Sequence, residues 1–185
     1  MMEVGILKLS DPKEILRNNA ESKKEKQIID AIASVKGEGA PVIILGDFNE
    51  PSFLDWTEKT KDMFAHHGAI VEWPTSKLLY KAGFKDAYRT KYPNEREYPG
   101  ITWPSEFEKK RKTTWAPKSD DRDRVDYIYY RGDNLKLNSA GIVGPKASYK
   151  LGKRTLENTE KDNFILTDMP WPTDHKAVFA ELILK

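Results

Sequence analysis

Four consecutive apolar residues at positions 42–45, most of them β-branched, predict a short strand between Pro41 and Gly46. An uninterrupted apolar run of this kind is typical of a strand that is buried on both faces. Asp47 and Asn49 follow at once, and they project to the same side if the chain stays extended. The end of this strand therefore either offers a carboxylate and a carboxamide to a ligand or metal, or closes in an Asx turn.

The composition limits what such a site could hold. The chain has 185 residues, of which 38% are hydrophobic, and this suits a single domain over residues 1–185. It contains no cysteine, so a metal would need oxygen or histidine ligands, which favours Mg²⁺, Mn²⁺ or Ca²⁺ over structural zinc. A net charge of +2 is too small to indicate nucleic acid or an anionic membrane as partner. The sequence has no long apolar run and no signal-peptide pattern, so we expect a soluble chain whose compartment stays open.

The rest of the chain predicts a mixture of helices and strands. One or two amphipathic helices are expected over 13–35, with a break at Asn18 and Asn19. Adjacent His66 and His67 point in different directions, so we interpret them as surface residues and not as a metal pair. The other expected elements are helices over 53–64 and 76–82, strands over 124–130, 135–143 and 176–184, a brief strand or turn over 84–88, a weak strand over 4–9 and a polar excursion over 144–168.

A carboxylate inside the predicted strand 124–130 needs a partner. Asp126 shares one face of this strand with Ile128, and burying it costs free energy unless it is paired with a cation or a strong donor. Arg124 lies on the same face and is one candidate. Asp174 and His175 stand at the start of the terminal strand, and Asp126 is the natural group to orient His175.

Three strand ends thus carry the polar groups that hydrolysis of a phosphate ester requires. A carboxylate can deprotonate water or bind a divalent cation that lowers the pKa of water. An amide can stabilise charge on phosphoryl oxygens, and an oriented histidine can donate to a non-bridging oxygen. Packing and turns explain each motif singly, but their occurrence together favours this chemistry.

These motifs resemble those of a known family. Residues 46–49 (GDFN), 124–128 (RVDYI) and 173–175 (TDH) are similar, in order and spacing, to the three C-terminal motifs of the endonuclease/exonuclease/phosphatase superfamily. The resemblance implies an α+β fold, a DNase I-like four-layer α/β/β/α sandwich. It also implies Mg²⁺- or Mn²⁺-dependent phosphoester hydrolysis. Nucleic acid, lipid head groups and small phosphoesters all remain open as substrates.

The resemblance also implies a role for each motif residue. Asp47 would activate water or shuttle a proton, and Asn49 would orient the phosphate. Asp126 would pair with His175, which would bind the phosphoryl group. The metal ligands would be Asp47, Asn49 and Asp174.

The family's upstream motifs have no counterpart here. They comprise an Asn, a Gln-Glu pair whose Glu is the main metal ligand, and a strand with a His, so we expect an incomplete sandwich that is truncated at its N-terminal side. The missing half could lie elsewhere, two copies could pair, or the shortened domain could fold alone. Two other hypotheses stay open: a catalytically inactive binding or assembly domain, and coincidental strand ends in another α/β fold. A basic cluster at 109–112 is interpreted as a solvated loop.

Overall fold

The computed structural model describes residues 10–35, 39–107, 118–156, 161–167 and 170–185. The weak strand expected over 4–9 and the basic cluster at 109–112 lie outside these residues.

Two helices precede the first described strand. Helix α1 (Pro12–Ala20) has Pro12 in its first turn, and the Asp11 side chain accepts a hydrogen bond from the Lys13 backbone nitrogen, 2.9 Å away. Helix α2 (Lys24–Ser34) begins after Lys23, whose φ of 57° is left-handed. Of the one or two helices expected over 13–35, two therefore form. The break between them lies after Ala20 and not at Asn18 and Asn19.

The strand predicted between Pro41 and Gly46 forms, and it lies at the edge of a sheet among the described residues. Strand β1 (Val42–Asp47) pairs antiparallel with β3 (Asp126–Arg131), which also pairs with the short β2 (Lys85–Asp86). In this register Asp47 stands directly opposite Asp126. The two carboxylates therefore belong to the same face of the sheet, because cross-strand partners project to the same side.

The expectation that 42–45 is buried on both faces is wrong. Val42 and Ile44 pack into a core cluster with Ile28 of α2, but Ile43 and Leu45 are 48% and 67% exposed. Strand β1 also has a strand neighbour on one side only among the described residues. Nothing in the described part of the chain covers the second face of β1 as α2 covers the first.

A second sheet has the order β7-β4-β8, from β4 (Leu135–Val143), β7 (Phe164–Ile165) and β8 (Ala177–Leu184). The expected strands over 135–143 and 176–184 are confirmed. The supposed excursion over 144–168 contains β7 and also a hairpin of β5 (Ala147–Lys150) and β6 (Lys153–Leu156). Its many polar residues concealed these short strands.

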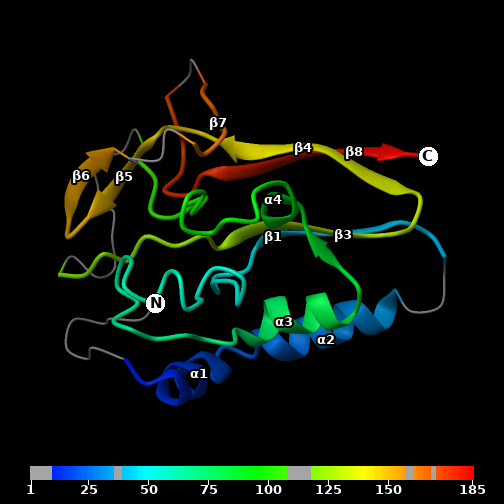
Figure 1. The fold of residues 1–185 in the computed structure, drawn as a ribbon, viewed down its shortest axis with the longest axis horizontal. Coiled ribbons are helices and arrows are strands. Elements are labelled where there is room, and N and C mark those ends of the chain that lie inside the picture. The colour runs from blue at the N-terminus through cyan, green and yellow to red at the C-terminus, as the bar shows by residue number, and fades with distance from the viewer. Residues whose placement is uncertain (1–9, 36–38, 108–117, 157–160, 168–169) are drawn as a thin grey trace.

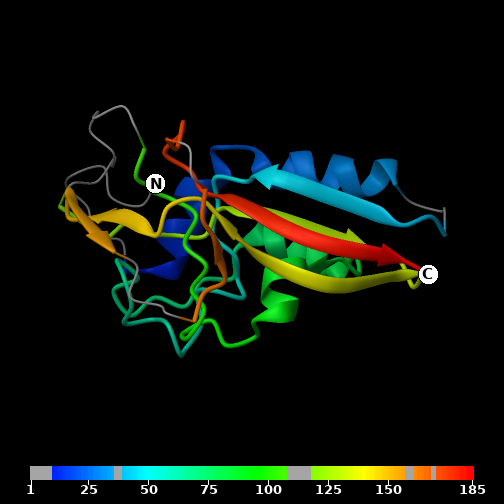
Figure 2. The same ribbon diagram turned by 90° about the horizontal axis from the view of Figure 1, so that it is seen from above.

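The elements stack in layers, as Figure 1 shows: helices α2 and α3 (Pro74–Lys81), then the sheet with β1 and β3, then the sheet with β4 and β8. Helix α4 (Ala87–Lys91) contacts both β3 and β4, so it lies where the two sheets meet. From above, β8 lies between β1 and β4 (Figure 2). This is an α+β arrangement with two facing sheets, although no described helix forms the outer fourth layer of the expected sandwich.

The helix expected over 53–64 does not form. The chain makes successive turns there, such as the bonds from Asp55 and Trp56 backbone nitrogens to the Ser52 carbonyl. Trp56 enters the core and stacks on His66, with ring centroids 3.7 Å apart. The surface interpretation of His66 is therefore wrong, since its side chain is buried, whereas His67 is exposed as expected. Local periodicity could not foresee this ring contact.

Among the described helices none could cross a membrane. The longest, α2, has 11 residues, whereas a spanning helix needs about 20 apolar ones.

Candidate active site

The first part of the site is the turn after β1. Gly46 has a φ of +143° and Asn49 a φ of +47°, both in the region that L side chains rarely adopt. Asp47 accepts two hydrogen bonds from Asn49, one from the backbone nitrogen at 2.7 Å and one from Nδ2 at 2.6 Å. The Asx turn therefore forms, and it fixes the orientation of the Asp47 carboxylate. The two interpretations of this stretch are compatible, because each carboxylate oxygen can accept more than one bond.

The second part is the start of β3. The Phe48 backbone nitrogen donates to the Val125 carbonyl at 2.9 Å, which joins the two strands beside the site. The buried Thr102 hydroxyl accepts from the backbone nitrogens of Val125 and Asp126, at 3.0 and 3.2 Å. These bonds hold the backbone at Asp126 while its side chain faces Asp47.

His175 is brought to the same point from the segment before β8. Its Nδ1 lies 3.0 Å from Oδ2 of Asp126, so the predicted pair forms, with Nδ1–H donating to the carboxylate. Burial lowers the pKa of His175, but the bond to Asp126 and the charges of Asp126, Asp47 and Asp174 outweigh it, so the pKa is raised. Because Nδ1 is engaged, Nε2 is the ring nitrogen that remains for a ligand.

The three side chains form one compact group. One ligand atom from each of Asp47, Asp126 and His175 lies within 4.8 Å of the others. Two carboxylates that face each other across strands repel unless a cation or donors balance them. Carboxylate oxygens suit a hard divalent cation such as Mg²⁺ or Mn²⁺, so the facing carboxylates fit the predicted class of metal.

Asp174 does not join this three-residue group. Its carboxylate lies 3.4 Å from the Thr173 hydroxyl, and its backbone carbonyl accepts from the Ser105 nitrogen at 2.6 Å. The carboxylate is still close enough to raise the pKa of His175. The roles of Asp174 and Asn49 as metal ligands stay predictions.

Arg124 pairs elsewhere. Its guanidinium is buried and bonds Asp55 and Asp86, with nitrogen–oxygen distances of 2.7 to 2.9 Å. Asp126 is therefore paired by His175 and not by Arg124. The physical reason is that Arg124 precedes β3, where the chain has not yet entered the regular alternation of the strand.

Sequence reasoning missed several residues that hold the site. Thr102 and Ser105 reach it from a loop far from all three motifs, and the Lys176 backbone nitrogen donates to the Thr102 carbonyl at 2.7 Å. Glu50, next to the GDFN motif, is completely buried. The position of Glu50 between the motif and Pro51 is visible in the sequence and could have marked it as a candidate. Its burial depends on contacts with helices that are distant in the sequence, and only the tertiary structure shows these contacts.

The site has the parts of an acid–base centre on an open surface. Asp47 is exposed and can accept a proton, and His175 is half-buried with a raised pKa and can donate one. Asp126 orients His175, and the Asn49 amide stands beside Asp47. This combination suits a reaction in which water attacks and negative charge develops on oxygen.

Comparison with known proteins agrees with this geometry. Residues 16–175 match the model of the endonuclease/exonuclease/phosphatase family, whose members are in general metal-dependent phosphoester hydrolases. An uncharacterized protein of Caenorhabditis elegans, F14F9.5, is 36% identical over 148 residues, which are 79% of this chain and 42% of that protein. The chain thus spans less than half the length of this relative. The family match covers most of the chain and includes every motif of the site, and on this basis the chain belongs to the endonuclease/exonuclease/phosphatase family.

Proposed function

We propose that this chain is a phosphoester hydrolase, acting on phosphodiesters, that depends on Mg²⁺ or Mn²⁺. The observation that carries the proposal is the meeting of Asp47, Asp126 and His175, which lie at the end of β1, at the start of β3 and just before β8. These residues are far apart in the sequence, and no core packing requires two carboxylates to face each other. Family membership supports the same reaction class.

Each side chain has a distinct task in the proposed reaction. Asp47 holds the attacking water and accepts its proton, while Asn49 donates from Nδ2 to a phosphoryl oxygen. Asp126 keeps the His175 ring oriented, so that Nε2–H faces a non-bridging oxygen as charge develops there. Asp47, Asn49 and Asp174 would hold a divalent cation, which would neutralise negative charge on the phosphoryl group.

The site as described leaves the substrate class broad. A net charge of +2 gives no strong field for a polyanion, so lipid head groups and small phosphodiesters are as compatible as nucleic acid. The exposed Asp47 shows that the centre is not enclosed by the described residues.

The test is hydrolysis of bis-p-nitrophenyl phosphate with Mn²⁺, in the presence and absence of EDTA. We expect turnover that EDTA abolishes and that Asp47→Ala lowers by about a hundredfold or more, in the range for loss of a catalytic base. Asp30→Ala is the matched control, because Asp30 is exposed on α2 and pairs with Lys26 on the same helix. Turnover that survives in Asp47→Ala would contradict the proposed role of this residue.

The rival hypothesis is a binding or assembly domain without activity. What favours it is that the sequence has no counterpart of the Gln-Glu pair whose Glu, by the family resemblance, is the main metal ligand. Calorimetric titration with Mn²⁺ separates the two. Binding that is lost in Asp174→Ala supports the metal centre, whereas a folded chain that binds no Mn²⁺ and has no turnover supports the inactive domain.

A further inference from the structure

The turn that carries Asp47 and Asn49 needs support from outside β1. Asn49 adopts a left-handed conformation, and the next residue, Glu50, passes from an exposed turn into the interior. A carboxylate that is completely buried must be satisfied by hydrogen bonds or charges. The contacts of this turn therefore help to hold Asp47 and Asn49 in place.

Glu50 is held by two helices. Its carboxylate accepts from Asn19 Nδ2, at the end of α1, at 2.5 Å. It also accepts from Thr75 at the start of α3, through the backbone nitrogen at 2.9 Å and through the hydroxyl. The residue before α3, Trp73, gives that helix no side-chain cap. Glu50, from outside the helix, instead accepts the hydrogen bond of a backbone nitrogen in its first turn.

A third helix contributes a cation. Lys24 is the first residue of α2, and its Nζ donates to the backbone carbonyl of Asn49. Burial lowers the pKa of Lys24, and the negative charges of Glu50 and Asp47 offset this only in part. We call Asn19, Lys24, Glu50 and Thr75 the turn anchor.

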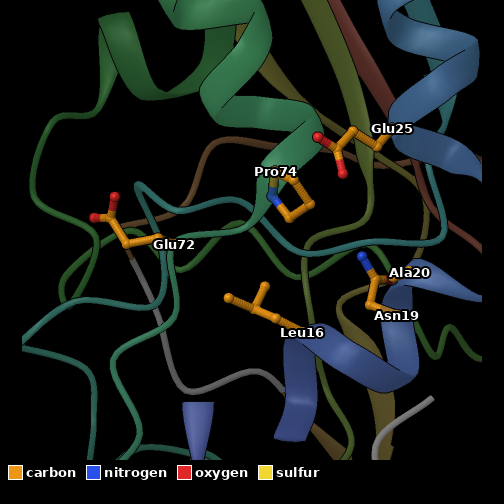
Figure 3. Close-up of a pocket in the computed structure, with 6 residues that line it drawn as sticks. All are labelled: Leu16, Asn19, Ala20, Glu25, Glu72 and Pro74. Carbon is orange, nitrogen blue, oxygen red and sulfur yellow. The ribbon is translucent and has the colours of Figure 1, made fainter. Parts of the chain in front are cut away.

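Apolar packing does not replace these contacts. A cavity of about 170 Å³ lies among the same three helix ends, with Asn19, Glu25 and Pro74 on its wall (Figure 3). Helices α2 and α3 pack together further along, through Ile28 and Leu79, but the pocket leaves the helix ends beside the turn without close packing. Directed polar bonds therefore add to the packing in fixing these ends around the turn.

We propose that Lys24 is a positioning residue of the active site, which fixes Asn49 and Asp47 by holding the Asn49 carbonyl. In the proposed function it touches neither substrate nor water, and it acts through the turn. Losing its bond lets the left-handed Asn49 relax, which moves the Asn49 amide and the Asp47 carboxylate together. The inference that Lys24 matters for turnover rests on the proposed hydrolase function, but the inference that it orders the turn does not.

Three variants test this inference. Lys24→Met keeps the length of the side chain and removes the donor, Lys24→Arg restores a cation and donor, and Lys26→Met is the control two residues along the same helix. Lys26 is exposed and pairs with Asp30, away from the turn. Thermal unfolding of each variant first establishes that it is folded.

The first measurement needs no activity. In metal-free protein labelled with ¹⁵N, the side-chain amide resonance of Asn49 should shift or broaden in Lys24→Met, stay near its position in Lys24→Arg and stay unchanged in Lys26→Met. An unchanged Asn49 amide in folded Lys24→Met would overturn the inference. This outcome is independent of whether the chain hydrolyses phosphoesters.

The second measurement is kinetic, with bis-p-nitrophenyl phosphate and Mn²⁺. We expect kcat to fall roughly tenfold to a hundredfold in Lys24→Met with KM nearly unchanged, since small displacements of reacting groups cost about this much. Lys24→Arg should recover most of the loss. Equal kcat in wild type and Lys24→Met, or equal losses in Met and Arg variants, would refute the positioning role. Absence of turnover in the wild type would instead refute the proposed function, and the Asn49 resonance would still decide whether Lys24 orders the turn.

Discussion

The two halves of the site are held by different kinds of interaction. The turn after β1 depends on side chains, because Glu50 and Lys24 reach three helix ends. The segment before β8 is tied largely through its own backbone groups: the Asp174 carbonyl and the Lys176 nitrogen bond a loop that contains Thr102, and the His175 carbonyl accepts from Trp171 Nε1. Single substitutions should therefore disturb the first half more than the second, unless they remove a group that itself takes part in the chemistry.

The largest effect is expected where the second half does carry chemistry. His175→Ala should lower kcat by about two to four orders of magnitude, the usual range for loss of a general acid, although its backbone contacts remain. Steady-state hydrolysis of bis-p-nitrophenyl phosphate measures this. His67→Ala, at an exposed histidine outside the site, is the control and should retain full activity. A His175→Ala variant with near wild-type kcat would show that the histidine only packs against Asp126.

The next effect concerns stability of the first half. Glu50→Ala should lower the free energy of unfolding by about 3 kcal/mol, because Asn19 and both donors of Thr75 lose their buried acceptor. Glu50→Gln retains an acceptor oxygen and should cost less. Urea denaturation measures both. Equal stability of Glu50→Ala and wild type would mean that the turn is not anchored through this carboxylate.

A smaller loss is expected from the hydroxyl that supports the second half. Thr102→Val keeps the shape of the side chain but leaves the backbone nitrogens of Val125 and Asp126 without their acceptor. The expected cost is about 2 kcal/mol in urea denaturation, and Thr102→Ser should recover most of it. If Val and Ser variants were equally stable, the two bonds would contribute nothing to holding Asp126.

The hydrogen-bonded pair of His175 and Asp126 should make the free energy of unfolding depend on pH. The pKa of His175 is raised in the folded chain, so protonation favours folding: the gain is complete below the ordinary value of about 6.5 and is lost as pH rises through the raised value. In EDTA, the unfolding free energy of wild type should thus fall above about pH 6.5 more steeply than that of Asp126→Asn. Parallel profiles from pH 5.5 to 9, measured by urea denaturation, would argue against this coupling.

The smallest change in stability is expected on the exposed face of β1, and it serves as the reference for the larger changes expected in both halves. Leu45→Thr should change the unfolding free energy of the monomer by less than about 0.5 kcal/mol, because Leu45 is 67% exposed. Size-exclusion chromatography with light scattering tests the idea that two copies pair there. A dimer that dissociates in Leu45→Thr would show that a second copy covers this face.

Much of the fold followed from local patterns. The helix around 76–82 and the strands β3, β4 and β8 could be predicted because apolar residues recur with the period of each element. The predictions failed where a ring or a charge found its partner far along the chain. Turns form in place of the helix expected over 53–64, where Trp56 stacks on His66. Arg124 forms ion pairs with Asp55 and Asp86 and not with Asp126.

The sequence by itself determined which polar side chains stand at the strand ends and that Asp126 would need a partner, for which it offered both Arg124 and His175. Residue type and strand parity are local properties, and they place each carboxylate on one face of its own strand. Tertiary structure decided the rest: the register that sets Asp47 opposite Asp126, the exposure of the second face of β1, and the turn anchor. These features arise from contacts between elements separated by many residues, and no local pattern encodes which helix end will reach a turn or which loop will supply a hydroxyl.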